Sequence, residues 1–440
     1  MKVLFVLLEI GSTVRVMPGI GQLSACLKIA GHQTDLVELD KYSTARVVNK
    51  ITSWHPDLLA VSVNTHMFPY AKKLIAFLKK RYKVLPIYVG GIHFKLNPDS
   101  FAEIEADGVC IGDGDNQFVA LVEAIAKKQD FLTLGNFWFK KGREIIKNPI
   151  TDLVMDLDSL PIPDYSIFSH FKNNQQVVPN FMFSRGCPFN CTYCCNSVLA
   201  KQFTPVSKYV RTLSVDRALT IIGYYDKHYS FDNFEIDDDT FSLNKKWVLE
   251  FCQKYQKQFK QRFICNIRVE TADREILQAL KEAGCEVIWV GVETGNEQLR
   301  RQVLGRFMTN DQIITVFDLA HSLNLKTGSF NMLGIPGETK ETIRQTIELN
   351  VRLKPDQVQV TFFYPYQKTK LYDQCLRAGY LRKTTLTNYF SGSILKLPTV
   401  GNRDLIKAEK YFRFNVYKHY SWLKALTSWP YYRKLRFRFK

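Results

Sequence analysis

Four cysteines lie close together in the segment SRGCPFNCTYCCN, at residues 184–196. Cys187, Cys191 and Cys194 have C-x3-C-x2-C spacing, and Cys195 follows directly. Such a group of thiols is compatible with a disulfide framework, a zinc site, an iron–sulfur site or a redox motif. The remainder of the chain has to decide between these four kinds of chemistry.

The composition favours metal binding or catalysis over disulfides. The chain has 440 residues, 46% apolar side chains and ten cysteines, which suits two or three domains and is far from the cysteine density of a small secreted domain. Glu9 interrupts the apolar N-terminal run, which we interpret as a buried strand rather than a signal peptide. No stretch reaches the roughly 18 apolar residues of a membrane span. We therefore expect a reducing bacterial or archaeal cytoplasm.

The spacing of the thiols narrows the choice further. A structural zinc site needs a fourth ligand, and no second Cys or His pair follows at zinc-finger spacing. A disulfide would leave an odd thiol. Three thiolates on one loop fit a cubane cluster with one iron left open, which is what a small chelating ligand needs. Cys195 points elsewhere from Cys194 in a regular loop, so we leave it out of the ligand set.

The first 145 residues alternate between short apolar strands and helices. This alternation predicts a doubly wound parallel sheet covered on both faces, which binds ligands at the carboxyl ends of its strands. The expected strands are 2–8, 58–64, 86–90 and 108–112, and the expected helices are 21–30, 70–82 and 116–128.

The loops that follow these strands are small or rich in glycine, which also ends strands in ordinary α/β folds. No G-x-G-x-x-G follows the first strand, so a dinucleotide site has little support. In their order, MPGIGQLSACLKIAGHQTDLVELD, PDLLAVSVNT, YVGGIH and DGVCIGDGD resemble the cobalamin-binding domain that precedes many radical S-adenosylmethionine (SAM) cores. The resemblance implies cofactor contacts from Gly19, Gly21, Ser62, Asn64, Thr65, Gly90, Gly91, His93 and Gly112.

The histidines depart from one cobalamin pattern. The D-x-H-x-x-G motif that supplies a cobalt ligand in many cobalamin proteins is absent. His32 begins a strand and is expected to be structural, whereas His66 and His93 at strand ends are candidates for corrin contacts. We therefore expect cobalt to lack a protein histidine on its lower face.

The second region, 181–370, carries the cysteine loop after the strand FMFSRG. The C-x3-C-x2-C pattern, with Tyr193 before the last cysteine, is similar to the radical SAM signature. Five later strand segments resemble the same superfamily in order: FEIDDDTF, FICNIRVE, VIWVGVETGN, SFNMLGIPGET and QVQVTFFYPY. Helices are expected between them at 245–259, 274–284, 310–323 and 339–353.

The resemblance implies a partial (β/α)6 barrel with its reacting groups at the strand ends. It assigns Cys187, Cys191 and Cys194 to a 4Fe–4S cluster. The further cofactor contacts that it implies are Tyr193, Asp238, Arg268, Glu293, Gly334 and Pro336. Two features depart from the pattern: Arg306 stands where many relatives have Lys, and YPYQKT replaces a P-G-T turn.

Structural alternatives exist for these residues. A capped turn explains Asp237, Asp238 and Asp239 better than a second metal site does, because no histidine cluster accompanies them. A structural ion pair is as good an interpretation of Arg268 as a ligand contact. Glu293 could cap a helix, although its place at the end of an apolar strand favours a ligand role.

The implied activity is that of a cobalamin-dependent radical SAM methyltransferase. Reductive cleavage of SAM would give a 5′-deoxyadenosyl radical that abstracts hydrogen, and cobalamin would donate a methyl group to an unactivated carbon. The alternative is a cyclisation, rearrangement or oxidation with the same cofactors. A methylthio-transferring enzyme would need a second cysteine trio, and the first domain has only Cys26 and Cys110. A non-catalytic cobalamin or cluster sensor would not need the whole series of strand-end motifs.

The remaining segments complete the predicted organisation. Residues 146–180 form a Pro-punctuated linker, and 371–440 form a mostly helical extension. From Arg403 onward, eleven Lys or Arg stand against two Asp or Glu. We expect 403–426 to be a helix packed on the barrel, whereas the basic aromatic end, 430–440, could contact an anionic membrane surface.

The expected partners follow from this organisation. They are a small-molecule or lipid-like substrate and an electron donor such as flavodoxin or ferredoxin. Nucleic acid is not an expected partner. The expected location is cytoplasmic, with possible peripheral contact at the inner membrane surface through the C-terminal tail.

Overall fold

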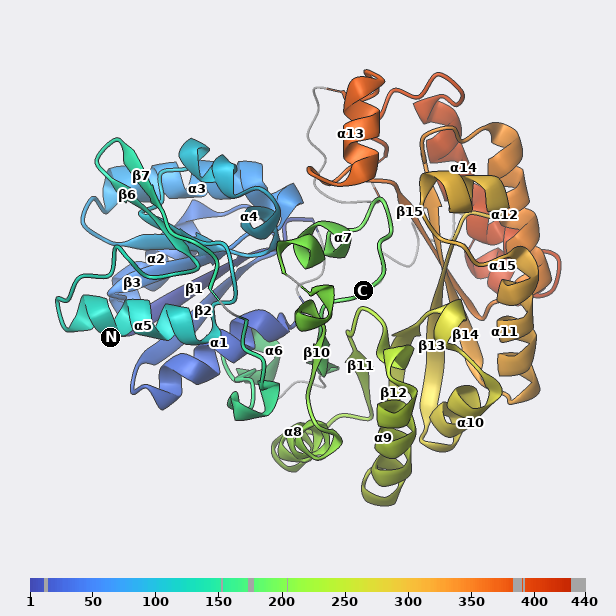
Figure 1. The fold of residues 1–440 in the computed structure, drawn as a ribbon, viewed down its shortest axis with the longest axis horizontal. Helices are drawn as coiled ribbons and strands as arrows, with labels where there is room; N and C mark the ends of the chain where they lie inside the picture. The colour runs from blue at the N-terminus through green and yellow to red at the C-terminus, as the bar shows by residue number, and fades with distance from the viewer. Residues whose placement is uncertain are drawn as a thin grey trace. The chain divides into compact units, whose positions relative to one another are not determined.

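The computed structural model describes residues 1–11, 15–151, 153–172, 178–203, 205–382, 390 and 392–428. The chain forms two compact units (Figure 1). The first unit comprises Met1–Gly186 and Val198–Phe231, and the second comprises Cys187–Ser197 and Asp232–Lys440. Within the described residues, none of the helices is long and apolar enough to span a bilayer. The domain limits at 145, 180 and 370 stay predictions.

The first unit contains a seven-stranded sheet in the order β2-β1-β3-β4-β5-β6-β7. The strands are β1 Lys2–Leu8, β2 Gln33–Leu39, β3 Leu58–Ser62, β4 Ile87–Gly90, β5 Gly108–Cys110, β6 Phe137–Lys141 and β7 Glu144–Lys147. The first five strands are parallel, which confirms the predicted doubly wound sheet. β6 and β7 extend one edge in the antiparallel direction, an addition that the alternating pattern did not predict.

Helices follow the parallel strands, and three of them lie close to the predicted ranges 21–30, 70–82 and 116–128. The helices are α1 Pro18–Ile29, α2 Thr44–Trp54, α3 Phe68–Arg81, α4 Ile92–Leu96 and α5 Asp115–Ala126. Pro18 occupies the first turn of α1, where its missing N–H costs nothing, and the Ser43 hydroxyl caps α2 by accepting from the Arg46 N–H. Leu74 and Ile75 of α3 are fully buried against the sheet core.

The predicted linker packs into the first unit through Tyr165. The Tyr165 ring takes the space that a Cβ on Gly21 would need, at 2.7 Å, and its hydroxyl donates to the Asn180 carbonyl at 2.6 Å. Gly21 therefore owes its lack of a side chain to this packing. The next elements along the chain are α6 Ser169–Lys172, β8 Asn180–Phe181, β9 Ser184–Arg185, α7 Asn196–Leu199, β10 Arg211–Thr212 and α8 Val215–His228.

Five parallel strands of the second unit run side by side in the order β15-β14-β13-β12-β11. They are β11 Asn233–Ile236, β12 Arg262–Ile267, β13 Cys285–Glu293, β14 Lys326–Leu333 and β15 Gln357–Phe362. The helices between them are α9 Lys245–Gln258, α10 Arg274–Glu282, α11 Asn310–Ser322 and α12 Lys340–Leu353. This alternation confirms the predicted barrel-type core, and it brings the strand ends to one edge of the sheet.

The two faces of this sheet differ in burial. Side chains such as Ile236, Ile267 and Val290 are buried on one face, whereas alternate residues on β12–β15, such as Trp289 and Phe330, keep partial exposure. Beyond β15 lie α13 Lys370–Arg377, α14 Asn402–Tyr417 and α15 Trp422–Ser428, which confirm a helical C-terminal extension. The predicted basic aromatic tail, 430–440, lies outside the described residues.

Candidate functional site

The cysteine loop belongs to the second unit and is largely buried. Cys187 and Cys191 are 8% and 6% exposed, and Cys194 is partly exposed with its thiol against that of Cys195. The Thr192 N–H donates to the Leu304 carbonyl at 3.0 Å. A segment more than one hundred residues away in sequence therefore fixes the middle of the loop.

The donor set of this loop fits an iron–sulfur cluster. Within the described part of the chain, no three His, Cys, Asp or Glu side chains converge tightly enough to hold one metal ion. In a cubane each thiolate binds a different iron, so the three cysteines need not meet at a point. When bound, such a cluster supplies the electron that cleaves SAM into methionine and the 5′-deoxyadenosyl radical.

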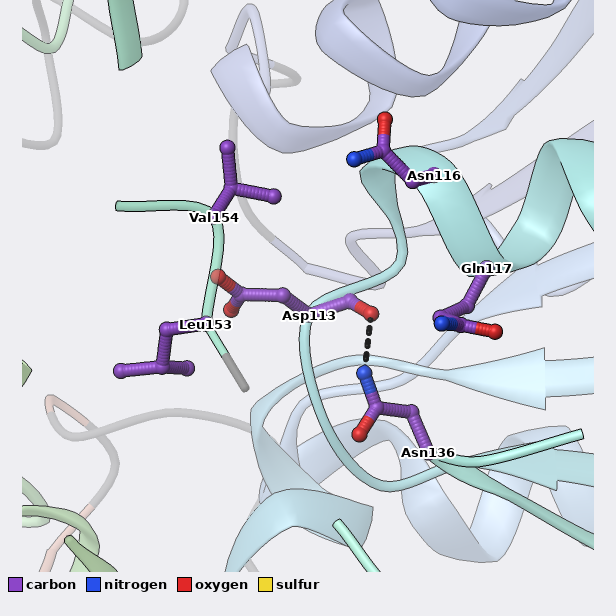
Figure 2. Close-up of a pocket in the computed structure, with 6 residues that line it drawn as sticks. All are labelled: Asp113, Asn116, Gln117, Asn136, Leu153 and Val154. Atoms are coloured by element: carbon purple, nitrogen blue, oxygen red, sulfur yellow. Dashed lines mark hydrogen bonds between the residues drawn. The ribbon is translucent and has the colours of Figure 1, made fainter. Parts of the chain in front are cut away.

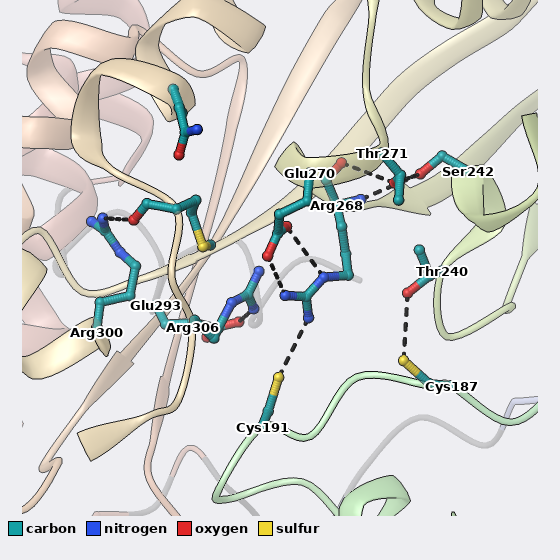
Figure 3. A network of polar contacts seen from close by, with 12 residues as sticks. Cys187, Cys191, Thr240, Ser242, Arg268, Glu270, Thr271, Glu293, Arg300 and Arg306 are labelled. Carbon is teal, nitrogen blue, oxygen red and sulfur yellow. Dashed lines mark hydrogen bonds and ion pairs between the residues drawn. The ribbon is translucent and has the colours of Figure 1, made fainter. Parts of the chain in front are cut away.

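Arg268 reaches the loop from the end of β12 (Figure 3). Its Nη1 donates to the Cys191 Sγ at 3.4 Å, and its guanidinium lies 3.7 Å from the centroid of the Phe189 ring. Glu270 accepts from the other side of the guanidinium. The Thr240 hydroxyl lies 3.8 Å from the Cys187 Sγ. A positive group beside the thiols suits ligands that bind metal as thiolates.

Glu293 and Arg306 form a second buried pair in the same unit. Arg306 Nη1 donates to Glu293 Oε1 at 2.8 Å, and the Tyr193 hydroxyl donates to the same oxygen at 3.2 Å. Glu293 has a φ of +65° at a β-bulge, a strained backbone that is typical of functional positions. Burial raises the pKa of Glu293, and the charge of Arg306 opposes this shift.

The guanidinium of Arg306 has donors to spare. It is 5% exposed, and its Nε and Nη2 have no hydrogen-bond partner among the described residues. Orphaned buried donors of a charged group are costly unless a ligand accepts from them. The carboxylate and ribose oxygens of SAM have the chemistry to do so, and in this respect the residues present fit that cofactor.

Arg300 fixes the chain segment that connects Glu293 to Arg306. It belongs to a π-helical turn, Leu299–Val303, and is fully buried. Its Nη2 donates to the Thr294 carbonyl at 2.6 Å and its Nη1 to the Met308 carbonyl at 3.0 Å. Single π-turns occur often at functional sites. Here the turn fixes the return path of the chain from Glu293 to Arg306.

The G-I-P-G-E turn after β14 is closed by its own glutamate. Glu338 is fully buried, and its Oε2 accepts from the Gly334 N–H at 2.5 Å. Its Oε1 has no hydrogen-bond partner among the described residues. Gly334 has a φ of +80°, which glycine adopts without strain. Burial raises the pKa of Glu338 to about 8.

The structure brings together several residues that the sequence singled out. Tyr193 of the cysteine loop donates to Glu293, and Arg268 donates to Cys191 of the same loop. Asp238 is buried, and its carbonyl accepts from Asn266 Nδ2 at 3.3 Å. Gly334 and Pro336 lie in the turn closed by Glu338. The ligand roles of all these residues stay predictions.

The sequence analysis did not single out Phe189 or Glu270, and it included Glu338 only within the segment SFNMLGIPGET. Phe189 stands between Cys187 and Cys191 in C-P-F-N-C, and Glu270 follows Arg268 in R-V-E. The only signal in the sequence was that they lie within a few residues of Cys187, Cys191 and Arg268. Which side chains meet depended on the fold.

The residues predicted to contact cobalamin lie mainly at one edge of the first sheet. Ser62 pairs with Gly90 where β3 and β4 end. Asn64 and Thr65 follow β3, and Gly112 follows β5. Small and neutral side chains at this edge fit a large ligand such as cobalamin, which when bound can carry a methyl group. A Cβ at Gly112 would meet the Asn136 side chain at 2.5 Å, so packing alone requires this glycine.

Neither histidine of this edge is exposed. Burial lowers the pKa values of His66 and His93 to about 4, so both are neutral. The ring nitrogens of His93 lie 3.4 Å from the Thr65 hydroxyl and 3.0 Å from the Ser100 hydroxyl, and its ring stacks on Phe68. Both ring nitrogens of His93 therefore lie near hydroxyl groups, and the absence of a histidine ligand on cobalt stays a prediction.

The loop after β5 forms a buried ion network within the first unit. Asp113 accepts from Arg211 Nη1 at 2.6 Å, and Asp115 accepts two bonds from Arg185 at 2.7 and 3.1 Å. A cavity of about 80 Å³ adjoins Asp113, with Asn116, Gln117, Asn136, Leu153 and Val154 as its other lining residues (Figure 2). Its volume suits a few water molecules and is too small for a corrin.

Two protein families match separate parts of the chain. Residues 181–349 match the radical SAM superfamily, and residues 9–122 match the B12 binding domain family. An uncharacterised methyltransferase of Pyrococcus horikoshii is 28% identical over 76% of this chain and 71% of its own length. An anaerobic magnesium-protoporphyrin IX monomethyl ester cyclase of Rubrivivax gelatinosus is 22% identical over 81% of this chain and 65% of its own length.

A solved structure shares the fold. The radical SAM methyltransferase TsrM of Kitasatospora setae, solved with cobalamin and a 4Fe–4S cluster, covers 92% of this chain and 80% of its own, with a TM-score of 0.70 at 14% identity. A radical SAM core and a B12 binding domain in one chain define a cobalamin-dependent radical SAM enzyme. The two matched families imply a 4Fe–4S cluster, SAM and cobalamin as cofactors, and the chain is similar to methyltransferases that have this combination of domains.

Proposed function

We propose that the enzyme methylates an unactivated carbon of a small-molecule or lipid-like substrate. The observation that carries this proposal is the gathering of Arg268 and the Glu293–Arg306 pair around the loop with Cys187, Cys191 and Cys194. In this proposal Cys187, Cys191 and Cys194 hold the cluster. A reductant is then required, and the net charge of +18 favours an acidic electron carrier of the flavodoxin or ferredoxin type.

The chain's own groups would place SAM against the open iron. Arg306 would direct its unpartnered Nε and Nη2 to the SAM carboxylate, while Glu293 accepts from a ribose hydroxyl. The Gly334–Glu338 turn would present backbone groups to the adenine. Tyr193 would keep the Glu293 carboxylate oriented through its hydroxyl. Burial of these groups would exclude water from the reacting atoms.

Isotope transfer tests the methylation. Anaerobically reconstituted enzyme would be incubated with dithionite, cobalamin and SAM deuterated in its methyl group, and the products resolved by mass spectrometry. Methyl transfer predicts both S-adenosylhomocysteine and 5′-deoxyadenosine, with the deuterated methyl in the product. The 22% identical cyclase makes a reaction without methyl transfer the second candidate. Formation of 5′-deoxyadenosine without S-adenosylhomocysteine would favour that candidate.

The partly exposed face of the second sheet, which carries Trp289 and Phe330, supports a substrate with an apolar or planar part. The rings of Trp289 and Phe330, on neighbouring strands, stack with centroids 4.6 Å apart. A Cβ at Gly328 would meet the Trp289 ring at 2.5 Å, so this glycine makes room for the indole. Asn266 and Gln359, both neutral, flank the pair in the register of the sheet. The aromatic pair therefore offers stacking and apolar contact without charge.

The C-terminal helix supports peripheral contact with an anionic bilayer. Trp422, Leu423 and Leu426 are 66%, 76% and 52% exposed and share one face of α15. The sequence from Trp429 onward adds five Lys or Arg, no Asp or Glu, and five aromatic residues. Apolar anchors beside cations suit a surface of anionic lipids.

Flotation with vesicles tests this contact. The intact protein is expected to float with phosphatidylglycerol vesicles and not with phosphatidylcholine vesicles. A triple change of Trp422, Leu423 and Leu426 to Ser should abolish flotation. A matched control, Ile29→Ser with Val84→Ser, changes two other exposed apolar residues and should have no effect. Equal flotation of the triple variant and the control would end the membrane proposal.

A further inference from the structure

All three guanidinium nitrogens of Arg268 donate hydrogen bonds. Arg268 is 8% exposed, and Nη1 donates to the Cys191 Sγ at 3.4 Å. Nη2 and Nε donate to Glu270 Oε1 and Oε2 at 2.5 and 3.3 Å. The face of the guanidinium stacks over Phe189 of the cysteine loop, 3.7 Å from the ring centroid. Three different groups therefore fix its position.

The backbone of Arg268 is also tied down (Figure 3). Its N–H donates to the Ser242 hydroxyl at 3.4 Å, and its carbonyl accepts from the Thr271 hydroxyl at 3.1 Å. The residue directly follows β12, so the sheet sets where its side chain begins. A planar fork can serve a carboxylate, a sulfur and a ring at once, which a lysine ammonium cannot do.

A fixed donor to a ligating sulfur has a specific electronic consequence. Reduction adds negative charge to an iron–sulfur cluster, and a hydrogen bond to a ligand sulfur stabilises that charge. Such a donor therefore raises the reduction potential of the cluster. Glu270 orients the guanidinium of Arg268 through two hydrogen bonds. Phe189, which belongs to the cysteine loop, stacks against the face of the same guanidinium.

We propose that Arg268, held by Glu270 and stacked on Phe189, is a positioning residue that sets the reduction potential of the cluster through the Cys191 sulfur. This inference rests on the proposed function in that Cys187, Cys191 and Cys194 must hold the cluster. It assigns to Arg268 a role toward the cluster, distinct from a contact with SAM or a purely structural ion pair.

A redox titration of the cluster, followed by electron paramagnetic resonance without SAM, tests the inference. Arg268→Met removes the donor and its charge and is expected to lower the midpoint potential. Arg268→Lys keeps the charge without the fork, so its midpoint should fall between those of the wild type and Arg268→Met. Arg262→Met, at the other end of β12, removes an exposed arginine and should leave the potential unchanged.

Iron and sulfide would be quantified in each variant. A full cluster in Arg268→Met with the wild-type potential would overturn the inference, as would a shift of equal size in Arg262→Met. If neither Arg268 variant assembles a cluster, the residue is structural and the inference is wrong. Failure of the wild-type protein to assemble a cluster would instead refute the proposed function, so the two failures can be told apart.

Discussion

Arg306 Nη1 and Glu293 Oε1 lie 2.8 Å apart, directly over the backbone of Gly291. A Cβ on Gly291 would stand 2.6 Å from each of these two atoms. The ion pair therefore exists because the strand carries no side chain at that position. The pair also depends on the bulge that gives Glu293 its positive φ.

Gly291→Ala should accordingly weaken SAM binding. The added methyl group forces Arg306 and Glu293 apart, and we expect the affinity for SAM to fall by about tenfold, or ~1.4 kcal/mol. Equilibrium dialysis with the reconstituted protein measures this. Gly401→Ala is the matched control, since the Cβ that it would add meets only the Asp404 side chain, at an ordinary contact distance of 3.5 Å. An unchanged affinity in Gly291→Ala would show that the pair does not serve SAM.

The ion network after β5 should dominate the stability of the first unit. Asp113→Asn leaves Arg211, whose side chain is 4% exposed, without its 2.6 Å carboxylate partner. Breaking a buried pair in this way costs about 3–5 kcal/mol. Urea unfolding should show this loss, whereas Glu103→Gln, which breaks an exposed pair with Lys72, should cost less than about 1 kcal/mol. Equal midpoints in the two variants would contradict the buried network.

Glu338 should make stability depend on pH. Burial raises its pKa from 4.5 to about 8, so the folded state binds a proton that the unfolded state releases between these values. Its contribution is therefore complete below about pH 4.5 and declines as the pH rises toward 8. Glu338→Gln removes this dependence, and the variant should gain thermal stability relative to the wild type between pH 6 and pH 8.5.

An exposed glutamate on the next helix provides the control. Glu341→Gln changes a side chain that is 54% exposed, and it should follow the wild-type pH dependence. A Glu338→Gln variant whose stability parallels that of the wild type across this range would mean that the carboxyl ionises freely in the folded protein.

The sequence allowed most of the architecture to be predicted because strand and helix periodicities are local. The strand segments ending near Asn64, Gly90, Arg268 and Glu293 all formed, and the cysteine spacing indicated the cluster loop. The antiparallel β6–β7 edge was missed because its short strands, FWFKK and EIIK, lack the apolar runs of the parallel strands.

The partners of the site residues could not be predicted in the same way. Tyr193 and Glu293 are 100 residues apart in sequence, and Arg268 and Cys191 are 77 apart. No local pattern encodes such a contact, since it depends on how strands and loops converge. The packing around two glycines could not be predicted either. Tyr165 and Asn136 fill the space that a Cβ would need at Gly21 and Gly112, and the ligand contacts expected at these glycines stay predictions.

The assignment of the cluster to three of the four loop cysteines is tested most directly by single alanine variants reconstituted without air. The measurement is the iron and sulfide content of each variant together with its release of 5′-deoxyadenosine from SAM. We predict that Cys187→Ala, Cys191→Ala and Cys194→Ala each lose both, and that Cys195→Ala retains both. Retention of cluster and 5′-deoxyadenosine release in any of the first three variants, or their loss in Cys195→Ala alone, would contradict the assignment.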